Sequence, residues 1–181
     1  MSNIKYSVFI AVSADGYIAG KDGALEWLSA VSREGEDYGY LEFFSTVDTL
    51  VMGRNTYEKV LSFGDWPYEK KDCIVLTKEK LKPRFNEKIM NASPIELDHI
   101  LQKEEKRKVY LDGGKLISSF LAAGFVDEII LSVIPVLLGE GIPLFHPNSG
   151  MQALKLMHVK SFESGLVQMK YAIHRKKEVE V

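Results

Sequence analysis

The sequence predicts an α/β fold in which a mostly parallel sheet ends in an antiparallel hairpin. Apolar, β-branched segments alternate along the chain with segments of helical periodicity, a pattern typical of strand–helix–strand units. The first strand-like segment, 6–12, is apolar throughout, as expected for a strand that is buried on both faces. Segments 154–162 and 167–174 are joined by Ser164-Gly165, which indicates a closing hairpin. Together these features favour a parallel sheet with one antiparallel edge.

The remaining elements follow from the same two periodicities and from local helix signals. Residues 38–45 carry apolar side chains at the spacing of a helix. Ser93, Pro94 and Glu96 form the strongest local signal, because they combine a capping box with a proline at the first helical position. In chain order we expect strands at 49–52, 73–76, 89–90, 109–111 and 128–134, and further helices at 55–61, 93–105 and 115–123.

Composition excludes several classes of protein. The 181 residues carry a formal net charge of −2, without the basic excess that nucleic-acid binding requires. No apolar stretch approaches the roughly 18 residues of a membrane span, and no signal peptide is visible. Cys73 stands alone and the four His lack ligand spacing, so we expect neither a disulfide nor a metal site. We therefore expect a cytoplasmic protein with one domain, 1–175, and a charged tail, 176–181.

Two strand–helix junctions have the features of phosphate-binding turns. Strand 49–52 leads into the turn 53–56, and strand 109–111 leads into the turn 113–115. Each turn places small residues and free backbone N–H groups at the positive end of a helix, where a phosphate can approach closely. Two such turns at strand carboxyl ends favour a dinucleotide that lies across the edge of the sheet.

Three cations stand at these strand ends. Arg54 and Lys115 belong to the two turns, and Lys78 follows the third strand directly after Thr77. Positive charge gathered there favours a cofactor with an additional phosphate, so we expect NADP rather than NAD. The alternative is that each cation is an ordinary surface charge.

Asp37 is a candidate acid, because it stands near the start of the helix expected over 38–45. A carboxylate at this position also stabilises a helix without any catalytic role, which is the simpler interpretation. Asp65, which precedes Trp66 and Pro67, has a similar alternative as a turn residue.

Five segments together carry a family resemblance. In chain order they are SADGYIA at 13–19, VMGRNTYE at 51–58, IVLT at 74–77, VYLDGG at 109–114 and PVLLG at 135–139. With these segments the chain resembles the dihydrofolate reductase-like superfamily. That superfamily includes dihydrofolate reductase and the reductase domain of bifunctional riboflavin-biosynthesis deaminase/reductases. The resemblance covers nearly the whole chain and implies a three-layer dihydrofolate reductase-like fold.

The resemblance implies an NADPH site on the turns described above. The first turn would hold the pyrophosphate and the 2′-phosphate side, and the second would take the nicotinamide-side phosphate. The residues after the third strand would flank the adenine ribose. The implied cofactor-binding residues are Ala11, Ile18, Gly53, Arg54, Asn55, Thr56, Leu76, Thr77, Lys78, Gly113, Gly114, Lys115, Leu116 and Ile117.

The resemblance also implies the chemistry. Asp37 precedes Gly53 by the interval that separates the pterin-binding carboxylate of dihydrofolate reductase from its turn, so Asp37 would anchor a heterocycle and assist its protonation. Ser132 would orient Asp37, and Asp65 is the reserve candidate. In an apolar pocket the pKa of Asp37 should be raised, since desolvation disfavours the charged form. Riboflavin-type domains pair through the hairpin and strand 128–134, which implies a homodimer.

Departures from dihydrofolate reductase favour the riboflavin-type domain. The motif Asp-Gly-Gly at 112–114 stands where dihydrofolate reductases have three glycines, and the segment 135–139 leans the same way. Only Lys70 and Lys71 lie near the position of the arginine that binds the folate tail, and lysine cannot reproduce its bidentate fork. The chain also has no zinc-deaminase motif. We therefore expect an NADPH-dependent reductase of a pteridine- or pyrimidine-type heterocycle, similar to 5-amino-6-(5-phosphoribosylamino)uracil reductase.

Three alternatives stay open. The protein could be dihydrofolate reductase itself, which turnover of dihydrofolate would identify. It could be a catalytically silent NADPH-binding module, which would bind NADPH without oxidising it. A structural dimer with a vestigial pocket would bind no nucleotide.

Overall fold

The computed structural model describes residues 3–146 and 151–174, and its elements alternate as the sequence predicts. The tail expected at 176–181 lies outside the described residues. The strands are β1 Lys5–Ser13, β2 Tyr17–Ala19, β3 Thr49–Gly53, β4 Asp72–Leu76, β5 Lys88–Met90, β6 Lys108–Asp112, β7 Val126–Ile134, β8 Ile142–Pro143, β9 Leu154–Ser161 and β10 Val167–Ile173. The helices are the short 3-10 helix η1 Glu26–Val31, α1 Tyr40–Thr46, α2 Arg54–Leu61, α3 Pro94–Lys103 and α4 Gly114–Ala122.

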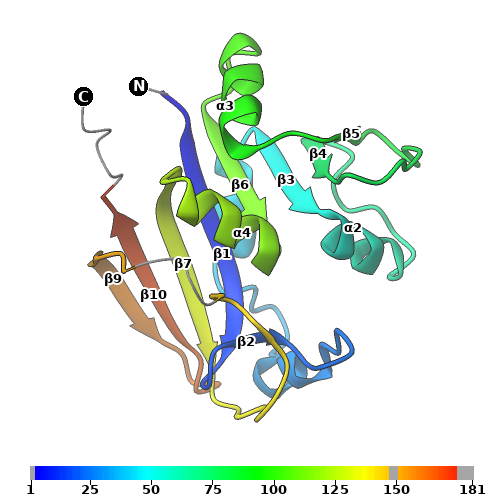
Figure 1. Ribbon diagram of the computed structural model, residues 1–181. Coiled ribbons are helices and arrows are strands. Elements are labelled where there is room, and N and C mark those ends of the chain that lie inside the picture. The colour runs from blue at the N-terminus through cyan, green and yellow to red at the C-terminus, as the bar shows by residue number, and fades with distance from the viewer. Residues whose placement is uncertain (1–2, 147–150, 175–181) are drawn as a thin grey trace.

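One eight-stranded sheet runs through the molecule in the order β5-β4-β3-β6-β1-β7-β10-β9 (Figure 1). The strands from β5 to β7 are parallel. β10 is antiparallel to β7 and forms the terminal hairpin with β9. The predicted parallel sheet with an antiparallel edge is therefore confirmed. Because β6 lies between β1 and β3, the carboxyl ends of these three strands meet at one edge of the sheet.

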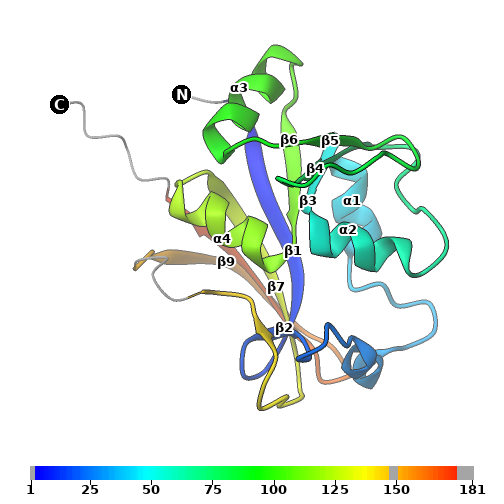
Figure 2. The same ribbon diagram turned by 45° about the vertical axis from the view of Figure 1, so that its right-hand side comes forward.

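Helices cover both faces of the sheet and give the fold three layers (Figure 2). On one face, Phe120 of α4 and Leu97 of α3 pack in a core with Leu111 of β6. On the other face, Tyr57 of α2 packs in a second core with Met52 of β3. All five side chains are buried. The expected three-layer architecture is confirmed.

The start of α3 confirms the strongest local signal in the sequence. The Ser93 hydroxyl oxygen accepts a hydrogen bond from the Glu96 amide at 3.3 Å, and the Glu96 carboxylate accepts from the Ser93 amide at 2.8 Å. This reciprocal capping box fixes the helix start. The helix ends at Lys103, two residues before the expected end.

Three short elements near the carboxyl ends of the strands were not predicted. They are η1 and a small sheet in which β2 pairs with β8. The carboxylate of Asp15 joins the turn before β2 to the loop after β7, because it accepts hydrogen bonds from the Leu138 amide at 3.1 Å and the Gly139 amide at 2.7 Å. It also accepts one from the Ser13 hydroxyl at 2.6 Å. These bonds hold both loops beside the end of β1.

The hairpin edge of the sheet carries apolar side chains in solvent. All eight residues of β9 are exposed. Among them, the side chains of Leu154, Leu156, Met157 and Val159 are between 44% and 55% exposed. In the described part of the chain, no helix has the length and apolarity that a bilayer crossing would require.

Candidate functional site

The turns after β3 and β6 lie against each other. A Cβ atom on Gly113 would stand only 2.4 Å from Thr56 Oγ1, and the Gly113 φ of +103° is one that favours glycine. Gly53 and Gly113 are the N-caps of α2 and α4, and neither helix start has a side-chain cap. The first-turn N–H groups of both helices therefore stay available to an anion. The structure thus brings the two predicted phosphate-binding turns together.

Other residues predicted to bind the cofactor lie around these turns. Leu76 ends β4 opposite Gly53 of β3, so the segment from Leu76 to Lys78 is beside the first turn. A Cβ on Gly114 would stand 2.9 Å from Ile18 Cδ1, which places Ile18 against the second turn. The side chains of Leu116 and Ile117 are buried in the core, so they could offer a ligand only their backbone groups.

The three predicted cations differ in their surroundings. Arg54 Nη1 lies 2.5 Å from a Glu79 carboxylate oxygen, and Arg54 Nε lies 3.8 Å from a Glu58 carboxylate oxygen. Within residues 3–146 and 151–174, no carboxylate forms an ion pair with Lys78 or Lys115. Arg54 is therefore the member of the set whose charge is already compensated.

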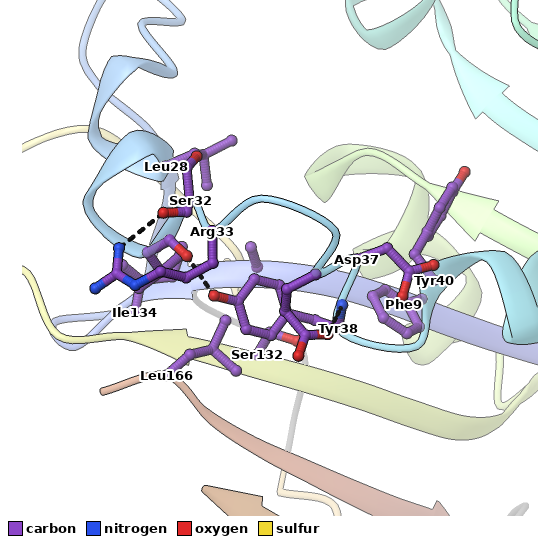
Figure 3. A pocket seen from close by; sticks show the side chains of 13 residues that line it. Phe9, Leu28, Ser32, Arg33, Asp37, Tyr38, Tyr40, Ser132, Ile134 and Leu166 are labelled. Carbon is purple, nitrogen blue, oxygen red and sulfur yellow. Dashed lines mark hydrogen bonds between the residues drawn. The ribbon is translucent and has the colours of Figure 1, made fainter. Parts of the chain in front are cut away.

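A cavity of about 400 Å³ opens beside the ends of β1 and β7 (Figure 3). Tyr38 lies across its middle, with Arg33 at one end and Tyr40 at the other. The walls combine apolar and aromatic side chains with a few polar groups, which is the usual character of a small-molecule site. The lining residues are Phe9, Ala11, Leu28, Val31, Ser32, Arg33, Glu36, Asp37, Tyr38, Tyr40, Ser132, Ile134 and Leu166.

Asp37 lines this cavity, but its electrostatics differ from the prediction. Its carboxylate is exposed and accepts hydrogen bonds from the Leu41 amide at 2.8 Å and the Gly39 amide at 2.9 Å. These bonds to the ionised form hold the pKa of Asp37 below its ordinary value. The expectation of a raised pKa is therefore wrong, because the carboxylate caps the start of α1 instead of being desolvated.

Ser132 is buried in the cavity wall, and its partner is Gln168 rather than Asp37. Gln168 stands opposite Ser132 in the β7–β10 ladder, and its amide nitrogen donates to the Ser132 hydroxyl oxygen at 3.0 Å. The same nitrogen donates to the Tyr38 carbonyl at 3.0 Å. Because Ser132 accepts this bond, its own hydroxyl proton stays directed away from Gln168.

Tyr38 is held in an uncommon conformation by contacts on several sides. Its φ of 56° is left-handed, a region that costs a residue with a side chain on the order of 1–2 kcal/mol. The hydroxyl donates to the Val31 carbonyl and lies 2.9 Å from the Ser164 hydroxyl, while the ring meets Phe162 edge to face. With the Gln168 bond, these contacts tie η1, the 32–39 loop and the terminal hairpin together around the cavity.

Asp112 is the titratable residue that sequence reasoning missed. It ends β6 directly before Gly113, and burial raises its pKa to about 6 despite an opposing hydrogen bond from the Gly113 amide. Burial and the nearby Asp112 charge also raise the pKa of Tyr110, and they raise that of Tyr40 to about 12. The sequence did contain a signal for Asp112, because it places a carboxyl group at the end of an apolar strand and directly before a predicted phosphate-binding turn.

Asp65 has no place in the cavity. It is exposed in the segment after α2, where the neighbouring Trp66 is the side chain that turns inward. Trp66 stacks on Phe85 and donates to the Asn86 side chain at 2.7 Å. The surroundings of Asp65 therefore agree with the alternative interpretation, in which it is a turn residue.

The family model and the similar proteins relate this chain to the same group of proteins. The family model of the RibD C-terminal domain matches residues 66–168. The uncharacterized Bacillus subtilis protein YwjB is 38% identical over 92% of this chain and 97% of its own length. A solved structure from Shewanella sp. PV-4, provisionally assigned to riboflavin biosynthesis, is 34% identical with a TM-score of 0.89. The match covers 95% of this chain and 100% of the Shewanella chain.

Two more distant structures share the fold. The deaminase/5-amino-6-(5-phosphoribosylamino)uracil reductase of Thermotoga maritima is 16% identical with a TM-score of 0.71, over 94% of this chain and 57% of its own. A dihydrofolate reductase from Enterococcus faecalis, complexed with NADP(H), is 19% identical with a TM-score of 0.68, over 96% of this chain and 98% of its own. At these identities the likeness concerns architecture.

The close approach of the two turns predicts the effect of one added methyl group. Gly113→Ala should lower the free energy of unfolding by about 3 kcal/mol, because it combines an unfavourable φ with an overlap at Thr56. Urea unfolding of the variant would measure this loss. Gly64→Ala is the matched control, since Gly64 has a φ of +93° with no atom near its Cβ position, and it should cost only about 1 kcal/mol. Equal losses would show that the turns do not touch.

Proposed function

The chain belongs to the RibD C-terminal domain family, and on this basis we propose that it is an NADPH-dependent reductase of a pteridine- or pyrimidine-type heterocycle. The observation that carries the proposal is the pair of abutting, uncapped helix starts. They lie at strand ends that also border the cavity, since Phe9 and Ala11 of β1 line it. Relatives of this fold include a 5-amino-6-(5-phosphoribosylamino)uracil reductase and a dihydrofolate reductase, which supports the general class of oxidoreductase.

The residues present fit a dinucleotide with an additional phosphate. Gly113 lets the two turns lie against each other, since any side chain there would overlap Thr56, and the helix starts of α2 and α4 offer uncapped N–H groups for phosphate oxygens. Lys115 and Lys78 supply positive charge that no described carboxylate compensates. The enzyme of Enterococcus faecalis, which has the same fold, was solved with NADP(H). NADPH, when bound, would supply the hydride.

The substrate would occupy the cavity beside Ser132. A hydride added to the carbon of a C=N or C=O bond must be balanced by a proton on the nitrogen or oxygen. We assign the supply of this proton to Asp112, which ends β6 at the same edge of the sheet and lies near Tyr40 of the cavity wall, although it does not line the cavity itself. Its pKa of about 6 means that it carries a proton closer to neutral pH than Asp37 does. Asp37 would accept hydrogen bonds from ring N–H groups, and Ser132 would donate to a ring oxygen or nitrogen.

Substrate assays would test the proposal and separate its alternatives. Purified protein with NADPH should oxidise the cofactor on addition of 5-amino-6-(5-phosphoribosylamino)uracil, whose reductase shares this fold. Oxidation with dihydrofolate alone would instead identify a dihydrofolate reductase. Tight NADPH binding without oxidation across pyrimidines and pterins would identify a silent binding module. A protein that binds no nucleotide would contradict the proposal altogether.

The two carboxylates should respond differently to replacement. Asp112→Asn should lower kcat by about 10²–10⁴, because it removes the proton source. In the unmodified protein kcat should fall as the pH rises through about 6, where Asp112 loses its proton, and this fall should vanish in the variant. Asp37→Asn should mainly raise KM. Steady-state kinetics across pH measure both, with the exposed Asp22→Asn as control. An unchanged pH profile in Asp112→Asn would contradict the assignment.

We also propose that the chain forms a homodimer through the hairpin. The exposed apolar side chains of β9 support it, since an uncovered apolar strand at a sheet edge invites pairing. Leu156→Lys should convert the dimer to a monomer, as light scattering would measure. Lys155→Ser, on the opposite side of the same strand, should leave the mass unchanged. A monomeric mass for the unmodified protein would end the proposal.

A further inference from the structure

We propose that Glu79 limits the selectivity of this site for NADPH over NADH by competing with the adenosine 2′-phosphate for Arg54. This inference rests on the proposed function, because it concerns the cofactor that the two turns would hold. It concerns which nicotinamide cofactor the chain accepts, and how strongly.

The competition follows from the position of the two residues at neighbouring strand ends. Arg54 is the first residue of α2 after β3, and Glu79 lies three residues beyond the end of β4. β3 and β4 are parallel neighbours that pair Gly53 with Leu76, so both side chains reach the same edge of the sheet. There Arg54 Nη1 and the Glu79 carboxylate are 2.5 Å apart. An adenosine lying across this edge would have its ribose beside this ion pair.

The turn that carries Glu79 is fixed by hydrogen bonds. The Thr77 hydroxyl oxygen accepts a hydrogen bond from the Glu79 amide at 3.0 Å. The Thr77 amide in turn donates to the Met90 carbonyl at 2.9 Å, which anchors the turn to the end of β5. Although the Glu79 side chain is largely exposed, its backbone is therefore held at the point from which the carboxylate reaches Arg54.

Charge distinguishes the two cofactors at this position. The Arg54 guanidinium is shared by Glu79 and by Glu58, whose carboxylate oxygen lies 3.8 Å from Nε, so the trio carries a net negative charge. A dianionic 2′-phosphate would have to displace Glu79 and would remain close to its charge. A ribose 2′-hydroxyl could instead donate to the Glu79 carboxylate while Arg54 stays paired. The trio thus penalises NADPH and tolerates NADH.

The magnitude of this penalty is moderate. An exposed ion pair contributes little on its own, so Arg54 remains available to a phosphate that binds it in a bidentate manner. The repulsion between Glu79 and the phosphate persists after the exchange, and at about 6 Å in water it corresponds to roughly a tenfold change in affinity. Lys78 and Lys115 are free of such carboxylates among the described residues, so the limit is specific to Arg54.

Titration of the protein with NADPH and NADH, followed by nicotinamide fluorescence, tests the inference without any substrate. Glu79→Gln should tighten NADPH binding by about fivefold to tenfold and leave NADH binding unchanged or slightly weaker. The gain should shrink at high salt, since the charges are exposed. Arg54→Ala should weaken NADPH binding, and adding Glu79→Gln to it should recover only the part due to direct repulsion.

Glu104→Gln is the matched control. Glu104 also forms an exposed ion pair, at 3.0 Å with Lys88, but Lys88 begins β5 at the opposite edge of the sheet from the turns, and the replacement changes the net charge equally. If Glu79→Gln binds both cofactors and the ratio of their affinities is unchanged, the inference is overturned and the proposed function stays intact. An equal gain in Glu104→Gln would overturn it too. Failure of the unmodified protein to bind either cofactor would contradict the proposed function itself.

Discussion

The contact between the turns after β3 and β6 is the constraint on which the site depends. Parallel strands that are neighbours in a sheet end together, and here their following helices start so close that Gly113 has room for no side chain beside Thr56. Two helix starts are thereby aimed at one region of space. Because the same sheet edge includes the end of β1, whose Phe9 and Ala11 line the cavity, the cavity and the turns lie at the same edge of the sheet.

The two carboxylates near this site show how environment divides similar groups. Asp37 is exposed and accepts two backbone hydrogen bonds, so it stays ionised and suits the binding of N–H groups. Asp112 is half-buried at a strand end near Tyr40 and Tyr110, and desolvation of its carboxylate raises its pKa, so it holds its proton to higher pH. A pair of titratable groups with separated pKa values is a common basis for assigning base and acid roles. From the sequence alone, Asp37 was the favoured candidate for the acid.

Most of the architecture was predictable because strand burial and helix capping leave local signals. The capping box at Ser93, the apolar strand 6–12 and the hairpin at Ser164-Gly165 all lie where expected. The short elements β2, β8 and η1 left no periodicity to detect. The site residues Gln168 and Asp112 were missed for another reason. The role of each depends on partners or burial contributed by distant parts of the chain. Arg54 was predicted as a cation of the first phosphate-binding turn, and its ion pair was missed because no sequence pattern shows that Glu79 meets it.

The carboxylate of Asp15 has a mechanical consequence. It holds the turn before β2 and the loop after β7 through a single group, and β2 and β8 extend that connection by pairing. Ile18 on the first segment touches the helix start at Gly114, where the nicotinamide end of a cofactor would lie. A displacement of one loop must therefore carry the other with it or break these bonds. The two loops on this side of the site are therefore mechanically coupled through the carboxylate of Asp15.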